Sequence, residues 1–361
     1  MKPVKGEVAW RLLDHPVVWL GQSVDTSSIC ASHPDLKKHH FLTSLGCAIR
    51  RPGLRRTHFG GGLREKLGVT GPLMIDSGGF ALLMNPNAKW TARVVGDLIE
   101  NIDAQIFVSL DLPPRREDSA EVRRHKILVS NRNFRTLSAR FPKKVIMPVI
   151  HGRTFREIEL SLTTLQKIIE SPKWVGLGGI VPLLQHRQVS REISQMSPEV
   201  FIAKALSMIR LVFPKTKIHA FGAGGTRTFP AIFALGGNSA DSIGWRQAAG
   251  FGSIFLPLKS QRAIRWNADA RPPRKILGED DLVQLRSCAC PTCAPLRSIE
   301  TQINDLSTSF RSRSIHNAWV IVNQHSYWPR SKSSLETFIG EGNLGLPWAR
   351  AMNALSRSLP L

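Results

Sequence analysis

Short apolar segments rich in β-branched residues alternate along this chain with longer amphipathic segments. Each apolar segment ends in a polar or glycine-rich turn, as buried strands commonly do. The segments between them place their apolar residues at helical spacing, for example TARVVGDLIENI and PEVFIAKALSMIRLVF. The predicted strands are PVVWLG, GPLMIDSGGF, AQIFVSLDLPP, KKVIMPVIHG, PKWVGLGGIVP, TKIHAFGAGG, SADSIGW and GSIFLPLK.

This alternation predicts an α/β fold with parallel strands, because parallel neighbours need crossover connections that are usually helices. About eight strands in one series favour a (β/α)8 TIM-like barrel over an open sheet. The stretch 22–71 fits this pattern least well, because it is long, basic and contains glycine, and the sequence does not place its strand. We expect a catalytic barrel over residues 1–278. A zinc-binding subdomain and C-terminal tail, residues 279–361, would pack on it.

Polar and glycine residues stand at the ends of the predicted strands. Active sites of such barrels lie at the carboxyl ends of the strands. An Asp after a strand commonly caps the next helix, but three acids that end separate strands favour a shared pocket. The residues at these ends are Asp76, Asp111, His151, Gly178, Gly179, Phe221, Gly222 and Asp241.

The formal net charge of +22 over 361 residues changes the picture. Such an excess attracts polyanions, so nucleic acid is favoured over a merely solvated basic surface. With 42% hydrophobic residues the chain can bury a core, and no apolar run approaches a membrane span. Neither a secretory signal nor a disulfide framework is evident, which favours a reduced, cytoplasmic setting.

Three of the five cysteines stand close together in SCACPTC, residues 287–293. Cys288, Cys290 and Cys293, followed downstream by His316, form a good zinc pattern of three thiolates and one imidazole. Four protein ligands fill a tetrahedron and leave no position for water, so the expected Zn²⁺ is structural. Free thiols clustered by chance or a redox pair are the alternatives.

Four motifs together resemble the tRNA-guanine transglycosylase family. They are DSGGF (76–80), SLDLPP (109–114), GLGGI (176–180) and CACPTC with His316-Asn317, in the family's order. The family is a (β/α)8 barrel with a zinc subdomain. Ala81 stands where the family usually has Gln, His151-Gly152 replaces Gln-Gly, and ADSIGW surrounds Asp241. These departures are more similar to the branch that inserts 7-deazaguanine bases into DNA.

The resemblance implies roles for these residues in a base exchange. Asp241 would attack C1′ of the sugar and form a covalent intermediate. Asp76 would protonate the departing guanine and then deprotonate the incoming base. Asp111 would read the N1–H and the 2-amino group, and His151 would donate to O6, although a core histidine is the alternative.

Further residues would complete the base pocket. Gly178 and Gly179 let the backbone approach the ring. Phe80 and Phe221 would stack on its faces, with core packing the alternative for Phe221. Ser77 and Gly78 belong to the same substrate-binding set.

The incoming base is expected to be 7-cyano-7-deazaguanine. GGIVPLLQ has leucines where bacterial tRNA enzymes have a Glu that holds an aminomethyl cation, and an apolar lining suits a neutral nitrile. In duplex DNA the target guanine must be flipped out or unpaired. Arg115-Arg116 and the 259–275 stretch would hold phosphates, and Trp245 or Trp266 would fill the gap unless they are buried.

The expected partners are DNA and proteins of a modification system, such as an ATPase, since this chain has no P-loop. Three alternatives remain at this stage. They are exchange in tRNA, glycoside hydrolysis and a non-catalytic RNA-binding role. The zinc pattern argues against a glycoside hydrolase, and the pair Asp76 and Asp241 argues against a non-catalytic subunit.

Overall fold

The computed structural model describes residues 16–30, 33–51, 53, 59, 61–85, 87–186, 190, 193–264, 275–328 and 332–358. Within these ranges, nine parallel strand segments form one sheet in the order β5-β4-β3-β2-β1-β9-β8-β7-β6. The segments are β1 Val17–Gly21, β2 Phe41–Ser44, β3 Leu73–Asp76, β4 Ile106–Val108, β5 Ile146–Met147, β6 Val149–Ile150, β7 Trp174–Leu177, β8 Lys217–Ala220 and β9 Ser239–Ser242.

The sheet closes into a barrel at residues 146–150, which contain both of its edge segments. Its two edges, β5 and β6, are separated only by Pro148. The carbonyl of Met147 accepts from Ser109 N–H after β4, and that of Pro148 accepts from Gly176 N–H on β7. Because β5 and β6 are halves of one strand, the nine segments make an eight-stranded parallel barrel, as predicted.

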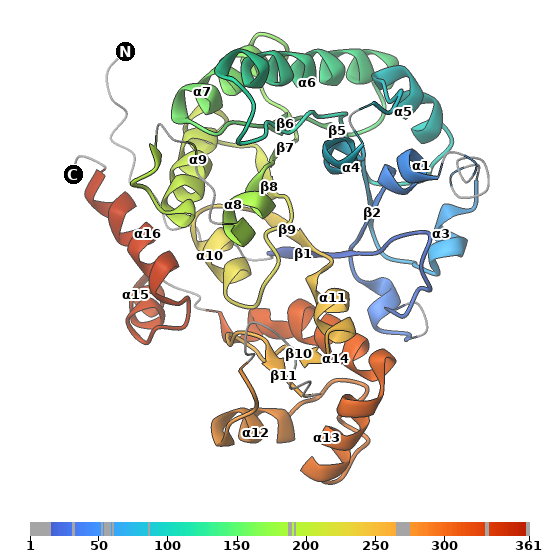
Figure 1. Ribbon diagram of the computed structural model, residues 1–361, viewed down its shortest axis with the longest axis vertical. Coiled ribbons are helices and arrows are strands. Elements are labelled where there is room, and N and C mark those ends of the chain that lie inside the picture. Colours follow the sequence, from blue (N-terminus) through green and yellow to red (C-terminus); the bar gives the residue numbers. More distant parts are fainter. Residues whose placement is uncertain are drawn as a thin grey trace.

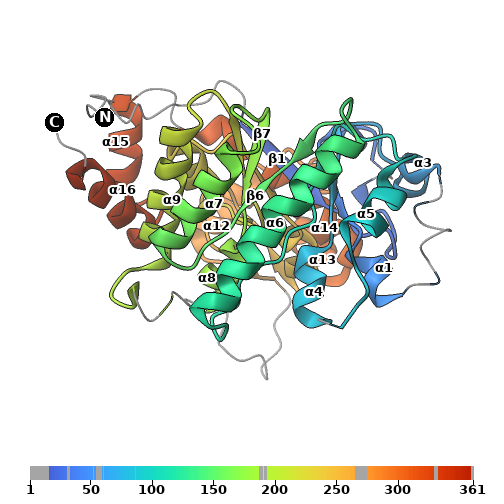
Figure 2. The ribbon, with the colours of Figure 1, turned by 90° about the horizontal axis from the view of Figure 1, so that it is seen from above.

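Helices cover the outside of the barrel (Figures 1 and 2). The apolar faces of these helices pack on the outward side chains of the strands, and together they form the largest hydrophobic core. The helices around the barrel are α1 Gly46–Arg50, α3 Leu63–Leu67, α4 Gly79–Met84, α5 Ala92–Ile99, α6 Ala120–Arg140, α7 Phe155–Gln166, α8 Ile180–His186, α9 Pro198–Val212, α10 Thr228–Ala234 and α11 Gly244–Gly250.

The inside of the barrel is a separate apolar layer. Trp19, Met74, Met147 and their neighbours on other strands fill it and are buried. Side chains alternate between the two faces of a strand, so the next inward positions lie toward the carboxyl ends. Those positions carry the polar residues of the candidate site.

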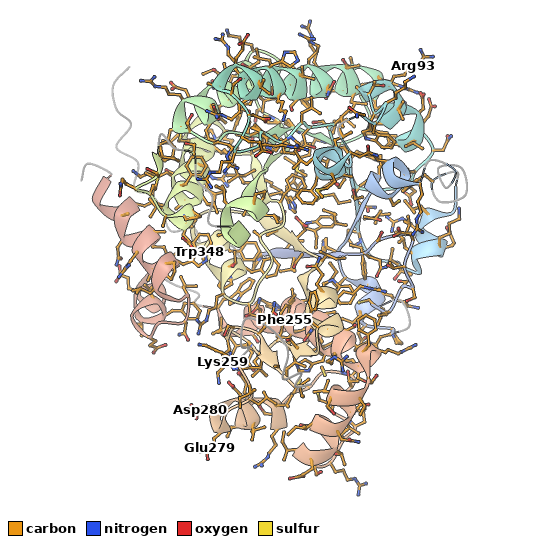
Figure 3. All side chains as sticks on the ribbon, in the orientation of Figure 1. Arg93, Phe255, Lys259, Glu279, Asp280 and Trp348 are labelled. Carbon is orange, nitrogen blue, oxygen red and sulfur yellow. The ribbon has the colours of Figure 1, made fainter. Side chains whose placement is uncertain are left out.

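The last part of the chain forms a lower layer beneath the barrel in Figure 1. It contains the antiparallel pair β10 Ser253–Ile254 and β11 Arg262–Ala263, with α12 Glu279–Arg286, α13 Ile299–Thr308, α14 Phe310–Asn323 and the short η5 Gln324–Tyr327. α15 Lys332–Gly340 and α16 Leu346–Ser358 lie apart from it, against the barrel beside α9 (Figure 1). Trp348 of α16 lies on that side, and Phe255 lies where the two layers meet (Figure 3).

One expected barrel strand is wrong. The segment GSIFLPLK supplies β10, and its Ile254 and Leu256 pack with Leu285 and Cys293 in the lower layer. The missing barrel strand is β2, which lies in the stretch 22–71, where the sequence does not place it. Its four residues contain only two large apolar side chains between basic and polar neighbours, so periodicity does not reveal it.

The boundary between barrel and zinc-binding subdomain at 278/279 stays a prediction. No helix in the described ranges combines the length and apolar character of a membrane span.

Candidate active site and metal centre

Asp76 ends β3 and faces the mouth of the barrel. Its Oδ2 accepts from the hydroxyl of Ser44, at 2.6 Å, and from Gly78 N–H, at 3.2 Å. Ser44 is the register partner of Asp76 on β2. Gly78 has a positive φ of 86°, and a Cβ there would press on the backbone of Gly46. One carboxylate oxygen is therefore held, and among the described residues the other has no hydrogen-bond partner.

The surroundings of Asp76 disfavour its negative charge. Burial, reinforced by the nearby carboxylates of Asp111 and Asp241, raises its pKa to about 7, against the hydrogen bonds from Ser44 and Gly78. The proton is thus held in the folded state at pH values where an unfolded aspartate has already lost it. A carboxyl group that titrates near neutral pH can act as an acid and then as a base.

This raised pKa predicts a pH-dependent stability difference for Asp76→Asn. Because the folded pKa exceeds the unfolded one of ~3.9, the carboxyl makes wild-type stability fall as the pH rises from about 4 to about 7. Asn does not titrate, so the variant should gain about 1 kcal/mol relative to wild type between pH 6 and pH 8. Urea unfolding at both pH values measures this difference.

Asp281→Asn is the matched control. Although burial opposes it, hydrogen bonds from Arg262, Lys259 and Gly278 N–H lower the pKa of Asp281 to about 2. Both test pH values lie above that pKa and above the unfolded value, so its stability change should be equal at pH 6 and pH 8. An equal change at both pH values for Asp76→Asn as well would contradict the raised pKa.

Asp111 lies in the loop after β4 and is buried with both oxygens engaged. Oδ1 accepts from Ser77 Oγ at 3.1 Å, and Oδ2 lies 2.7 Å from His151 Nε2. If Asp111 is ionised, Nε2 carries the hydrogen and donates. His151 Nδ1 is buried with no partner in the described structure, so donation from it as well requires the imidazolium form.

The glycines after β7 leave room for this arrangement. A Cβ at Gly178 would collide with the His151 ring, and Gly179 has a positive φ of 76°. Likewise a Cβ at Gly176 would collide with the Phe221 ring. Phe221 is partly buried against the inner layer, whereas Phe80 on α4 is 56% exposed.

Asp241 lies on β9, in register with Trp19 of β1. Its Oδ1 accepts from Gly222 N–H at 2.7 Å and lies 3.2 Å from His219 Nε2. Within the described part of the chain, Oδ2 has no hydrogen-bond partner. Asp76 and Asp241 therefore share one arrangement, in which backbone and side-chain donors hold one oxygen and leave the other.

Sequence reasoning missed three residues that contact these acids or their partners: Ser44 beside Asp76, His219 beside Asp241, and Ser239, whose Oγ lies 2.7 Å from His219 Nδ1. Ser44 lies on the strand that periodicity did not reveal. His219 and Ser239 lie inside β8 and β9, and strand alternation puts them on the same inward face as Phe221 and Asp241. His219 and Ser239 each stand two residues before a predicted site residue, and this spacing could have identified them from the sequence.

The structure describes only some of the residues that were expected to hold phosphates or to fill the gap in the base stack. Trp245 is fully buried and donates to Gly21 O, so it cannot enter a base stack. Lys259 is engaged with Asp281. Arg116 is exposed in the loop between β4 and α6. Most of the 259–275 stretch, namely residues 265–274 with Trp266, lies outside the described residues.

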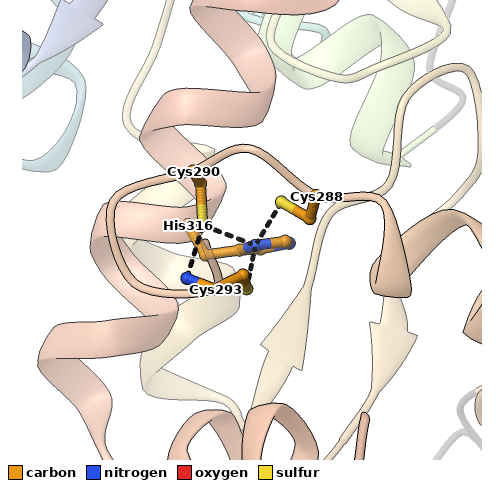
Figure 4. A group of neighbouring side chains, drawn as sticks. All are labelled: Cys288, Cys290, Cys293 and His316. Atoms are coloured by element: carbon orange, nitrogen blue, oxygen red, sulfur yellow. Dashed lines mark hydrogen bonds between the residues drawn. The ribbon is translucent and has the colours of Figure 1, made fainter. Parts of the chain in front are cut away.

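The four expected metal ligands come together in the lower layer (Figure 4). The three cysteines lie in the loop after α12, and His316 lies on α14. His316 Nδ1 lies 3.6, 3.4 and 3.5 Å from the sulfurs of Cys288, Cys290 and Cys293. A tetrahedral zinc ion with ordinary bond lengths would separate these atoms by about 3.5 Å. The group therefore fits a structural zinc site.

A hydrogen bond to the backbone orients the imidazole of His316 toward the sulfurs. His316 Nε2 donates to Phe255 O at 2.8 Å, which leaves the Nδ1 lone pair for the metal. The next residue, Asn317, accepts from Phe255 N–H and donates to the carbonyls of Trp245 and Ser253. This pair explains why His and Asn stand together, because one binds the metal and the other fastens α14 to the barrel.

The chain is similar in sequence to curated enzymes of one name. The chain is 25% identical over 288 residues to the tRNA-guanine(15) transglycosylase of Methanosarcina mazei, covering 73% of this chain and 54% of that protein. It is 21% identical over 322 residues to the enzyme of the same name from Pyrococcus furiosus, covering 88% and 50%. No family model matches. The chain spans about half the length of these curated relatives.

Proposed function

We propose that this chain, a distant member of the tRNA-guanine transglycosylase family, exchanges guanine in a nucleic acid for a 7-deazaguanine base. The observation that carries the proposal is the pair Asp76 and Asp241. Each presents one unpartnered oxygen at the carboxyl end of the barrel, and Asp111 with His151 lies beside Asp76.

The proposed reaction has two displacements at the same carbon. Asp241 Oδ2 attacks C1′, the bond from C1′ to guanine breaks, and the electron pair leaves with guanine, which takes the proton of Asp76. The incoming base then gives its N9 proton to Asp76 and attacks C1′, which releases the Asp241 carboxylate. Two inversions retain the configuration at C1′, and no other cosubstrate is needed.

The base pocket is assigned to Asp111 and its neighbours. The remaining lone pairs of Asp111 would accept from N1–H and the 2-amino group, which favours a guanine-like edge. His151, as an imidazolium, would donate to O6 through Nδ1 while Nε2 donates to Asp111, and Phe80 would cover the ring. α8 contains no acid in its sequence, and its Val181 packs on Gly222 beside Asp241. An uncharged substituent such as the nitrile of 7-cyano-7-deazaguanine suits that surface better than an ammonium.

DNA is the proposed polymer. The support is the net charge of +22 and the departures at Ala81, His151 and around Asp241 from the pattern of the tRNA enzymes. Exchange in tRNA is the second candidate, because the relatives named above carry tRNA in their names. Structural zinc would hold the lower layer and take no part in the exchange.

Labelled 7-cyano-7-deazaguanine tests the polymer directly. The purified protein is incubated with label and with plasmid DNA, single-stranded DNA or unmodified tRNA. We expect label in DNA and more in single strands, because the target base must leave the stack. Label in tRNA alone would transfer the proposal to tRNA. Label in no polymer, with a folded protein that contains zinc, would count against base exchange itself.

A further inference from the structure

His219 lies inside the barrel and connects two neighbouring strands. Its side chain is fully buried and meets the ring of Phe221 edge to face, with 4.5 Å between centroids. Its Nδ1 lies 2.7 Å from Ser239 Oγ, and its Nε2 lies 3.2 Å from Asp241 Oδ1. Ser239 is also fully buried. Ser239 and Asp241 on β9 are thus connected by hydrogen bonds through His219 on β8.

The direction of these bonds follows from the carboxylate. An ionised Asp241 only accepts, so His219 Nε2 must carry a hydrogen and donate it. The hydroxyl of Ser239 can donate to Nδ1 of a neutral ring or accept from an imidazolium, so it holds the ring in either state. All hydrogen-bonding capacity of the imidazole is thereby used, as expected for a polar group buried beside an apolar layer.

Two donors converge on the same oxygen of Asp241. Gly222 N–H reaches Oδ1 from the turn after β8, and His219 reaches it from within the strand. The carboxylate cannot rotate without breaking both bonds. Oδ2 is thus held in one position, and among the described residues it has no hydrogen-bond partner.

We propose that His219, oriented by Ser239, is a positioning residue that selects Oδ2 of Asp241 as the attacking oxygen. This inference rests on the proposed role of Asp241. His219 does not touch the substrate. It keeps one carboxylate orientation through both displacements, and its donor on Oδ1 stabilises the carboxylate when the glycosyl bond breaks.

Two substitutions of similar size separate the two ends of the imidazole. In His219→Gln the amide nitrogen reaches about as far as Nε2 and can still donate to Asp241. In His219→Asn the amide ends near the position of Nδ1 and can meet only Ser239. We expect His219→Asn to lower kcat about 10- to 100-fold, the value of a hydrogen bond to a charged group. His219→Gln should stay within about fivefold of wild type, and KM should hardly change in either variant.

The outcomes are distinct. Equal activity of the two variants, at any level, or a loss confined to KM would overturn the positioning role. Ser239→Ala supplies the comparison if His219→Asn does not fold, and it should lower kcat with KM unchanged, whereas unchanged kcat would count against the proposal. If wild type forms no covalent adduct, the role of Asp241 fails first. Crystal structures of the two variants then test the orientation of the Asp241 carboxylate by itself. A carboxylate that rotates in His219→Asn but not in His219→Gln supports the positioning role, and one that is unmoved in both variants refutes it.

Discussion

Asp241→Asn should abolish base exchange, lowering kcat by about 10⁴-fold or more, as removal of a nucleophile does in comparable enzymes. The amide has nearly the shape of the carboxylate and can still accept from Gly222 N–H, so the fold should be preserved. It lacks the negative charge that an attack on C1′ requires. Denaturing gels of protein incubated with labelled nucleic acid should show a covalent adduct for wild type and none for the variant.

Binding should be retained in Asp241→Asn, because the substitution leaves every basic side chain that could contact phosphates unchanged. Gel-shift titration at fixed salt measures this. Asp97→Asn is the matched control, since Asp97 is an exposed acid paired with Arg140 on the outside of the barrel. It should keep full exchange. An adduct in Asp241→Asn would show that another residue is the nucleophile.

Loss of one metal ligand should unfold the lower layer. We expect Cys290→Ser to purify without near-stoichiometric zinc and to lose a large part of the ~5 to 15 kcal/mol that stabilises a typical domain. Cys290 is fully buried, and His316 and Asn317 of α14 connect the metal site to the barrel through Phe255, Trp245 and Ser253. Without the metal, three thiols and an imidazole would have to share this buried space.

Metal analysis and urea unfolding with and without a chelator measure the effect. Cys30→Ala is the matched control, because Cys30 is equally buried but stands on the barrel. Burial raises the pKa of its thiol to about 12, so it behaves as a small apolar side chain. That variant should keep its zinc and lose only about 1 kcal/mol. A zinc-free Cys290→Ser protein with wild-type stability would refute a structural role for the metal.

Local patterns were enough to predict much of this protein. Seven barrel strands are visible in the sequence as apolar segments. Each is buried on both faces, by the helices outside and by the apolar layer inside the barrel. The four zinc ligands are visible because three stand within six residues and the fourth lies a short way downstream in the apolar stretch RSIHNAWVIV. The acids at the strand ends follow from parallel topology, which brings carboxyl ends to one face.

Tertiary structure alone decided the rest, since the remaining features depend on residues far apart in the chain. β2 is a strand because β1 and β3 need a partner between them, although its own sequence barely marks it. GSIFLPLK is apolar enough for the barrel, but the lower layer buries it instead. The pKa of Asp76, raised to about 7, arises from burial and from two acids on other elements, Asp111 in the loop after β4 and Asp241 on β9. Which oxygen of Asp241 is free depends on Gly222 and His219, and only closure of the barrel brings those donors to it.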